Sequence, residues 1–435
     1  MARVELDIHL EGRLDPVGRL EGLDDGTLMF RYLTDDLPFP ISMSLPLREE
    51  PYRDAASRAF FSNLLFENAQ REQVMERHSL DFNDVAGLLY HLGRDCPGAI
   101  SCVPKGEGPA KQPGNLTQDY DALGPDDLAE IMRSLRDFRR LPDKTRDPSP
   151  LAGVQGKVAL ARLADGRFGF PKTDRNVPTT HILKVPRLAD MRSVDQEHIL
   201  MGMMAAAQRH PLAATEILGE GDLQGLLITR FDRRLDGASV SRVHQEDFCQ
   251  ALGLGPHLKY QRNGTRERSF SARAVGELLS KTANPGQARQ AFLEVSLVNL
   301  LLGNTDNHAK NHALLYQTPL PVFAPVYDVV STIIDDHVLH QLSFDVGRAN
   351  MTDEISSADI EALVMDLGFP RMTPALRRRL GSIVGSVAGQ IGEMAGPARK
   401  RLGDAIAEQA RPLAAALGLK IYIPERDAIY LNRPE

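Results

Sequence analysis

Residues 141–150 constrain the fold of this chain more than any other stretch, because three prolines and six polar or charged residues lie among these ten positions. Proline has no amide hydrogen, so it interrupts the regular hydrogen bonding of helices and strands. The 435 residues also predict two or three domains, at about 150 residues per domain. We therefore expect a boundary at this run, with separately folded parts before and after it.

Before the boundary, alternating apolar and polar residues predict strands over 4–10 and 41–47. Helical patterns cover residues 60–75, 83–92 and 119–140. We expect residues 1–110 to form an N-terminal α/β subdomain and residues 111–150 to form a helix and a linker.

After the boundary, the pattern predicts three strands, a helix and a further strand, over 158–163, 167–170, 181–185, 193–209 and 226–231. The remainder is mainly helical, and its largely apolar stretch 291–302 predicts a buried helix. We expect domains at 151–232 and 233–435, and a fold of the α+β class.

Composition excludes several classes of protein. A chain with 42% hydrophobic and 25% charged residues can bury a core without disulfide or metal staples. Its longest apolar run is far shorter than the ~20 residues that span a bilayer, and the first residues lack a signal sequence. Three cysteines without a CxxC pair favour reduced thiols in the cytoplasm. The net charge of −7 argues against a broad nucleic-acid-binding face.

Asp306 and Asn311 lie five positions apart, directly after the predicted buried helix. Phosphoryl transfer needs a carboxylate that orients the substrate hydroxyl and a neutral oxygen ligand for a phosphate-bound metal, and an Asp-x4-Asn loop supplies both. Downstream, Asp328 follows a short apolar strand, where a second metal-binding carboxylate belongs, although Val330 replaces the glycine of the kinase DFG motif. An Asp/Asn-rich turn and an ordinary strand-ending acid remain alternatives.

Two weaker signals lie in the strand-rich part. The segment 152–157 carries Gly153 and Gly156 three apart, so its amides could approach a polyphosphate, and Lys157 adds charge. Lys184 lies inside an apolar strand, and Glu197 in the next helix is a possible partner. An ordinary turn and an exposed ion pair are the alternatives.

These signals occur in the order found in kinases: glycine loop, strand lysine, helix glutamate, buried helix, Asp-x4-Asn and metal-binding aspartate. Two competing readings are weaker. His308 and His312 have a helical zinc spacing but lack the glutamate after the first histidine, and no Gly-x-Ser-x-Gly elbow supports a serine hydrolase.

The residues resemble the HipA family, the serine/threonine-kinase toxins of bacterial toxin–antitoxin pairs. The resemblance covers nearly the whole chain, through residues 41–47, 60–65, 92–99, 151–157, 178–184, 230–234, 244–253 and 303–311. It implies a two-lobed, protein-kinase-like fold with an additional N-terminal subdomain and a mainly helical C-terminal lobe.

The resemblance also implies ATP and Mg²⁺ as cofactors, with Asp306 as catalytic base and Asn311 and Asp328 as metal ligands. The implied nucleotide-binding residues are Ala152, Gly153, Val154, Gln155, Gly156, Lys157 and Lys184 at the phosphates, Thr229, Arg230 and Phe231 at the adenine hinge, and His308, Lys310 and Tyr327 lining the site. Members of the family phosphorylate an aminoacyl-tRNA synthetase, most often the glutamyl enzyme, and growth then stops. A HipB-like helix-turn-helix antitoxin neutralises the toxin and tethers it to operator DNA.

One departure from the family pattern concerns self-regulation. Pro150 stands where relatives carry an inactivating autophosphorylation serine, and Ser149 lies one residue earlier. We predict that Ser149 is modified instead. Two other functions remain open: a small-molecule phosphotransferase, and a kinase-like co-repressor that acts by binding its antitoxin on DNA.

Overall fold

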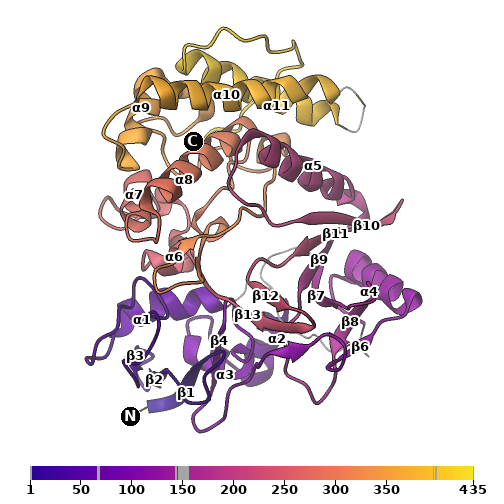
Figure 1. The fold of residues 1–435 in the computed structure, drawn as a ribbon, viewed down its shortest axis with the longest axis vertical. Coiled ribbons are helices and arrows are strands. Elements are labelled where there is room, and N and C mark those ends of the chain that lie inside the picture. The colour runs from indigo at the N-terminus through magenta and orange to yellow at the C-terminus, as the bar shows by residue number, and fades with distance from the viewer. Residues whose placement is uncertain are drawn as a thin grey trace. The chain divides into compact units, whose positions relative to one another are not determined.

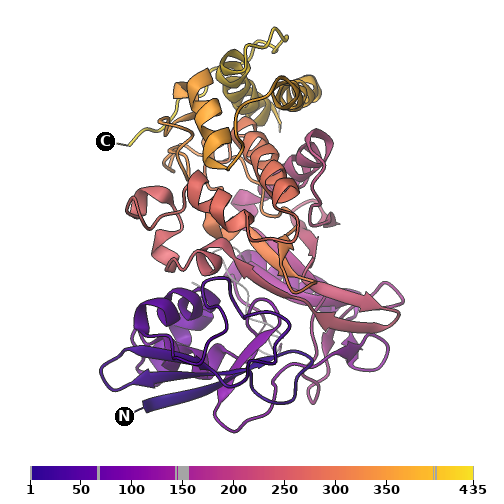
Figure 2. The ribbon, with the colours of Figure 1, turned by 60° about the vertical axis from the view of Figure 1, so that its left-hand side comes forward.

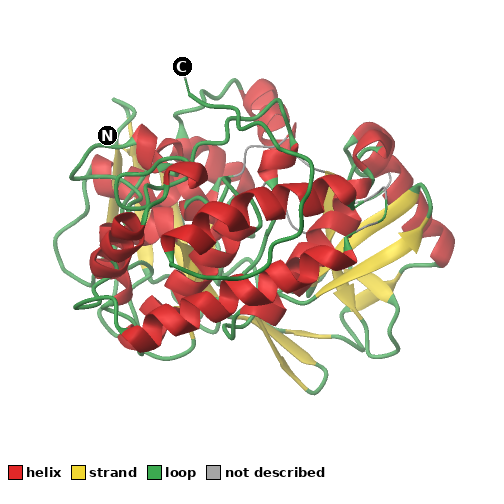
Figure 3. Cartoon of the chain, turned by 90° about the horizontal axis from the view of Figure 1, so that it is seen from above, coloured by secondary structure: helices red, strands yellow, loops and turns green. Residues whose placement is uncertain are grey.

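The computed structural model describes residues 2–65, 69–142, 145, 156–394, 396 and 399–434. It divides into two compact units, each built from segments that are distant in sequence. Unit 1 comprises Met1–Val194, Ala214–Pro256 and Leu314–Pro321, and unit 2 comprises Asp195–Ala213, His257–Ala313 and Val322–Glu435. Helices and strands are both abundant, as an α+β fold requires (Figure 3).

Unit 1 begins with an antiparallel sheet in the order β3-β2-β1-β4. Its strands are β1 (Ala2–Leu10), β2 (Gly18–Leu23), β3 (Leu28–Tyr32) and β4 (Ile100–Pro104), and the helices of this part are α1 (Asp54–Phe61), α2 (Ala69–His78) and α3 (Val85–Leu92). Alternate residues of β1, such as Leu6 and Ile8, are fully buried with α1 and α3 side chains in one core. These elements are the indigo and violet part of the ribbon (Figure 2).

Two sequence predictions fail in this part. The strand expected over 41–47 is absent, and only an isolated bridge joins Ser42 to Leu45. The Glu246 carboxylate accepts hydrogen bonds from the Ser42 hydroxyl and from the amide of Met43 at 2.9 Å. The Met43 amide is therefore bound to a side chain and not to a neighbouring strand. The helix expected over 60–75 is interrupted, because α1 ends at Phe61 and α2 begins at Ala69.

The second sheet of unit 1 has six strands in the order β10-β11-β9-β7-β8-β6. They are β6 (Tyr120–Ala122), β7 (Gly156–Arg162), β8 (Phe168–Pro171), β9 (His181–Val185), β10 (Thr215–Glu220) and β11 (Leu223–Thr229). Helix α4 (Pro125–Phe138) packs on it through Ile131, Met132 and Leu135 (Figure 1). The helix expected over 119–140 is therefore shorter, and β10 was not foreseen.

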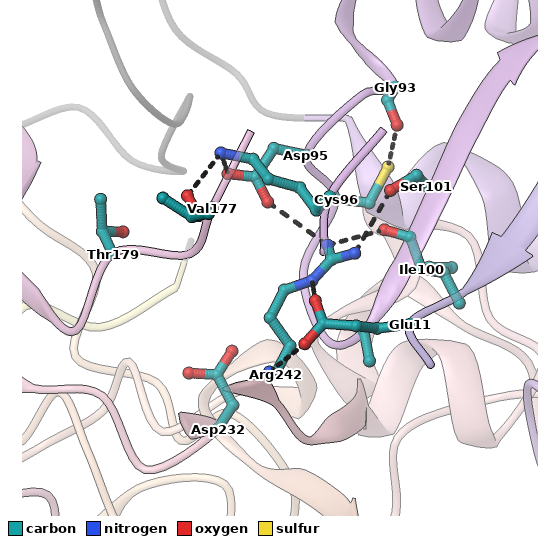
Figure 4. Close-up of polar contacts among 12 residues, drawn as sticks. Glu11, Gly93, Asp95, Cys96, Ile100, Ser101, Val177, Thr179, Asp232 and Arg242 are labelled. Atoms are coloured by element: carbon teal, nitrogen blue, oxygen red, sulfur yellow. Dashed lines mark hydrogen bonds and ion pairs between the residues drawn. The ribbon is translucent and has the colours of Figure 1, made fainter. Parts of the chain in front are cut away.

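A small sheet of unit 1 joins β5 (Gly114–Asn115), β12 (Arg233–Asp236) and β13 (Ser239–Arg242). Arg242, at the end of β13, is almost fully buried with the Glu11 carboxylate, which accepts from its Nε at 2.6 Å. Its guanidinium also donates to the carbonyl of Ile100 and faces Asp95 at 3.4 Å (Figure 4). These buried charges connect β13 with the N-terminal part of unit 1.

Unit 2 is mainly helical. It contains α7 (Ala272–Leu279), α8 (Pro285–Leu301), α9 (Ser357–Asp366), α10 (Pro374–Gln390) and α11 (Lys400–Ala416). Helix α8 is buried on nearly all sides, and α10 packs against both α8 and α11 (Figure 1). The remaining α-helices and strands of the described residues are α5 (Arg192–Ala207), β14 (His244–Asp247), α6 (Phe248–Ala251), β15 (Ala313–Tyr316) and β16 (Val322–Phe323). In the described part of the chain, no helix has the length and apolar character to cross a membrane.

Candidate active site

The loop that follows α8 begins at Gly303, whose backbone has a φ of +69°. An added Cβ at this position would lie 2.5 Å from the side chain of Ile333. Only glycine adopts this left-handed conformation without strain and leaves room for Ile333. The glycine therefore ends the buried helix and turns the chain into the polar segment that follows.

Buried polar residues hold this loop in one conformation. The Asn304 side chain donates to the Asn299 side chain of α8 at 2.8 Å. The amide of Thr305 donates to the Thr332 hydroxyl at 2.8 Å, and the amide of Thr332 donates to the carbonyl of Gly303 at 2.9 Å. Asn299, Asn304 and Thr305 are buried, so the loss of one of these hydrogen bonds would cost free energy.

The structure brings Asp306 and Asn311 together. The Asn311 side-chain nitrogen donates to the main-chain carbonyl of Asp306 at 2.8 Å, and the amide of His308 donates to the same carbonyl at 2.8 Å. A short 3-10 helix, Ala309–Asn311, closes the loop. The side-chain nitrogen of Asn311 is therefore engaged inside the loop.

The carboxylate of Asp306 is 42% exposed, so a substrate can reach it. Its Oδ1 accepts a hydrogen bond from the hydroxyl of Tyr260, and Nε2 of His308 lies 4.0 Å from the same oxygen. Burial, followed by the contact with Asp306, raises the pKa of Tyr260. The tyrosine therefore keeps its proton at neutral pH and acts as the donor.

Burial and nearby charges set the protonation of His308, whose Nε2 lies 4.0 Å from Oδ1 of Asp306. Burial lowers its pKa to about 4, whereas the negative charges of Asp306 and Asp328 act in the opposite direction. The imidazole is therefore neutral near pH 7.

Asp328 has a φ of +61°, one of three positive values among the described residues other than glycine. Such a conformation costs free energy and occurs preferentially at functional sites. Next to it, the hydroxyl of Tyr327 donates to the carbonyl of Lys310 at 2.8 Å, which joins this segment to the loop that contains Asn311.

The donor atoms of Asn311 and Asp328 suit Mg²⁺, because an amide oxygen and a carboxylate are hard ligands. Among the described residues there is no cluster of three or more His, Cys, Asp or Glu that could hold a metal ion by itself. Two protein ligands completed by phosphate oxygens would be the usual magnesium arrangement in kinases. His312, considered above for zinc, is packed against the aromatic rings of Phe292 and Phe323.

The other predicted site residues with described positions, apart from Glu197, lie in unit 1. Lys184 is on β9, between β7 and β11, and its register partners are Lys157 and Leu226. Gly156 begins β7. Thr229 ends β11, and Arg230 and Phe231 follow it.

Arg230 forms a buried ion pair with Asp232 at 2.9 Å, and its amide donates to the carbonyl of Thr180. Glu197 lies on α5 and is buried, within unit 2. Four residues of the expected glycine loop, Ala152, Gly153, Val154 and Gln155, lie outside the described residues, as does Ser149.

Three residues that support the loop, Tyr260, Asn299 and Thr332, were not predicted from the sequence. Two of them act through a contact with a residue distant in sequence: Tyr260 lies 46 positions from Asp306, and Thr332 lies 27 positions from Thr305. No local pattern marks such residues. Asn299, a buried polar residue in the largely apolar stretch 291–302, was the one visible signal.

Comparisons with known proteins place the chain in context. Residues 6–103 match the family model "HipA N-terminal domain", and residues 149–393 match "HipA-like C-terminal domain". The chain is 31% identical over 391 residues to the putative kinase Y4mE of Sinorhizobium fredii, covering 88% of this chain and 90% of the relative. It is 32% identical over 347 residues to the serine/threonine-protein kinase toxin HipA of Shewanella oneidensis, covering 77% and 76%.

A solved structure is similar over nearly the whole length. It is the HipA, HipB and operator DNA complex of the Shewanella oneidensis MR-1 toxin–antitoxin system, matched with a TM-score of 0.74 and 27% identity. The match covers 95% of this chain and 96% of that chain. The fold class expected from the sequence is thereby confirmed.

Proposed function

The chain belongs to the HipA family, and on that premise we propose that it is an ATP-dependent serine/threonine-protein kinase and the toxin of a type II toxin–antitoxin pair. Its relatives include proteins named as kinases and as a kinase toxin, and these names support a kinase-like enzyme of the HipA type. The cofactors, the substrate and the roles of individual residues are part of the proposal.

One observation carries the proposal: the loop that holds the exposed Asp306 carboxylate also holds Asn311, whose side chain donates to the main-chain carbonyl of Asp306. Asp306 would orient the substrate hydroxyl and accept its proton while that oxygen bonds to the terminal phosphorus of ATP and ADP leaves. Such a general base contributes about 10²–10⁴-fold in rate.

Asn311 and Asp328 would hold Mg²⁺, which neutralises charge on the phosphates when it is bound. His308, Lys310 and Tyr327 would line the nucleotide site from the same loop and the following segment. Residues 152–157 and Lys184 would contact the phosphates, Glu197 would support Lys184, and Thr229, Arg230 and Phe231 would form the adenine hinge. The division into domains at 1–110, 111–150, 151–232 and 233–435 remains part of this proposal.

The substrate would be an aminoacyl-tRNA synthetase, with the glutamyl enzyme as the first candidate, and the reaction would halt translation. The partner would be a HipB-like helix-turn-helix antitoxin, through which the chain would reach operator DNA. The solved relative that supports this idea was crystallised with HipB and its operator DNA.

The deciding experiment incubates the purified chain with Mg²⁺, radiolabelled ATP and bacterial lysate, and identifies any labelled protein by mass spectrometry. We expect one labelled synthetase band with wild type and none with Asp306→Asn. Label on a small metabolite instead of protein would indicate a small-molecule phosphotransferase. Nucleotide binding without any transfer would indicate a co-repressor.

The same phosphotransfer reaction tests whether the chain phosphorylates itself at Ser149. Phosphopeptide mapping of the wild type should place phosphate on Ser149, and Ser149→Ala should remove it. If no phosphate maps between residues 147 and 151, self-regulation of the family's kind is absent from this chain.

A further inference from the structure

The residues before and after Tyr260 in the chain, Lys259 and Gln261, both form hydrogen bonds within unit 2. On one side, the carbonyl of Lys259 accepts from the amide of Ala309 in the candidate catalytic loop at 3.0 Å. On the other side, the Gln261 side chain donates to the Asp345 carboxylate at 2.6 Å and accepts from the Asp345 amide at 3.0 Å. The backbone of residue 260 is therefore fixed relative to the loop that carries Asp306.

The ring of Tyr260 is fixed as well. It meets the ring of His308 edge to face, with 5.2 Å between the two ring centroids. The guanidinium carbon of Arg262 lies 3.9 Å from the centroid of the Tyr260 ring. Edge-to-face aromatic pairs and cation–π contacts each favour one ring orientation. Backbone and ring together direct the hydroxyl at Oδ1 of Asp306.

The two oxygens of Asp306 consequently have different surroundings. Oδ1 accepts from Tyr260 and faces His308, whereas within the described part of the chain no hydrogen bond to Oδ2 is found. The carboxylate remains 42% exposed in spite of these contacts. A substrate hydroxyl can therefore approach Oδ2 while Oδ1 is occupied.

We propose that Tyr260 is a positioning residue for phosphoryl transfer: its hydroxyl holds Oδ1 of Asp306 so that Oδ2 is presented to the acceptor hydroxyl. This inference rests on the proposed function. A carboxylate without this restraint can rotate about its bond to Cβ, and catalysis depends on a correctly oriented group more than on its presence alone. ATP itself has no contact with Tyr260 in this scheme, so its binding does not depend on the hydroxyl.

The test variant is Tyr260→Phe, which removes only the hydroxyl group and keeps the ring beside His308 and Arg262. Tyr120→Phe is the matched control, because the Tyr120 hydroxyl donates to the carbonyl of Pro178 at 2.5 Å, within unit 1. Initial rates of label transfer from ATP to lysate protein are measured for both variants over a range of ATP concentrations. Binding of a fluorescent ATP analogue and thermal unfolding are measured on the same preparations.

We expect Tyr260→Phe to lower the apparent kcat by about 10-fold or more, since hydrogen bonds to a charged group contribute on that scale. The KM for ATP and the affinity for the analogue should stay within about twofold of wild type, and Tyr120→Phe should retain wild-type kinetics. An unchanged or raised kcat for Tyr260→Phe, or equal losses in both variants, would overturn the positioning role.

The two proposals fail in different ways. If the wild-type chain transfers no phosphate to protein, the proposed function is wrong and the role of Tyr260 falls with it. If wild type is active and Tyr260→Phe equals it, the function stands and only the positioning role is lost.

Discussion

Arg242 donates to both oxygens of the Glu11 carboxylate, one through its main-chain amide and one through Nε, each at 2.6 Å. The two side chains are 1% and 3% exposed, so this ion pair is shielded from solvent. Glu11 lies just beyond β1, and Arg242 is separated from it by 231 positions. The contact joins the N-terminal part of unit 1 to the strand β13.

Removing one partner of this pair should destabilise the protein. We expect Arg242→Ala to lower the free energy of unfolding by about 3–5 kcal/mol, because the Glu11 carboxylate would remain buried without its partner. Arg162→Ala is the control, since Arg162 and Glu216 form an exposed pair that contributes less than about 1 kcal/mol. Urea denaturation of the full chain measures both, and equal midpoints for the two variants would contradict the prediction.

Replacing the candidate base should abolish transfer without affecting the fold. We expect Asp306→Asn to lower phosphotransfer by about 10²–10⁴-fold, because the amide cannot accept the substrate proton. Asp366→Asn is the control, as Asp366 pairs with the exposed Arg273 at 2.9 Å. Label transfer and circular dichroism are measured on both variants. A fully active Asp306→Asn would rule out this residue as the base.

Gly303→Ala should weaken the loop that follows α8. The left-handed conformation costs a residue with a Cβ about 1–2 kcal/mol, and contact with Ile333 at 2.5 Å adds to this. Gly385→Ala is informative as a comparison, because that glycine lies inside α10 with nothing within 4 Å of an added Cβ. It should stabilise the helix by roughly 0.5–1 kcal/mol. Opposite shifts in melting temperature are therefore expected, and shifts of the same sign would contradict the argument.

His244 makes folding stability depend on pH. Its Nε2 contacts the carbonyl of Ile41 at 2.8 Å and its Nδ1 accepts from the amide of Ala99, so the ring is held in the neutral form. Burial lowers its pKa from 6.5 to about 4. Between these values the unfolded chain binds the proton and the folded chain does not, so stability is complete above pH 6.5 and falls as pH decreases to 4.

His244 alone should account for roughly 3 kcal/mol of that loss, at about 1.4 kcal/mol per pKa unit. We expect His244→Gln to be less stable than wild type at pH 7.5 but to lose less stability between pH 6.5 and 4. His257→Gln, at an exposed position, serves as the control. Parallel pH profiles for wild type and His244→Gln, measured by urea denaturation, would show that this histidine is not responsible.

Local patterns gave the elements whose residues face a core. The alternation in residues 4–10 predicted β1, and the largely apolar residues 181–185 predicted β9 with correct ends. Residues 41–47 alternate just as clearly but form no strand, because the Glu246 carboxylate, some 200 positions away, takes the hydrogen bonds of that segment. An alternating hydrophobic pattern indicates which side chains are buried, but it does not indicate which group forms hydrogen bonds with the backbone.

By itself, the sequence determined the membership in the family, the α+β class and the short-range spacing of Asp306 and Asn311, because these depend on residues close together in the chain. Tertiary structure alone decided which groups surround those residues. Tyr260 reaches Asp306, and Glu11 reaches Arg242, only after the chain has folded back on itself. Such contacts depend on burial and on the positions of backbone segments that are distant in sequence. The spacing of residues within a short segment predicts neither of these properties.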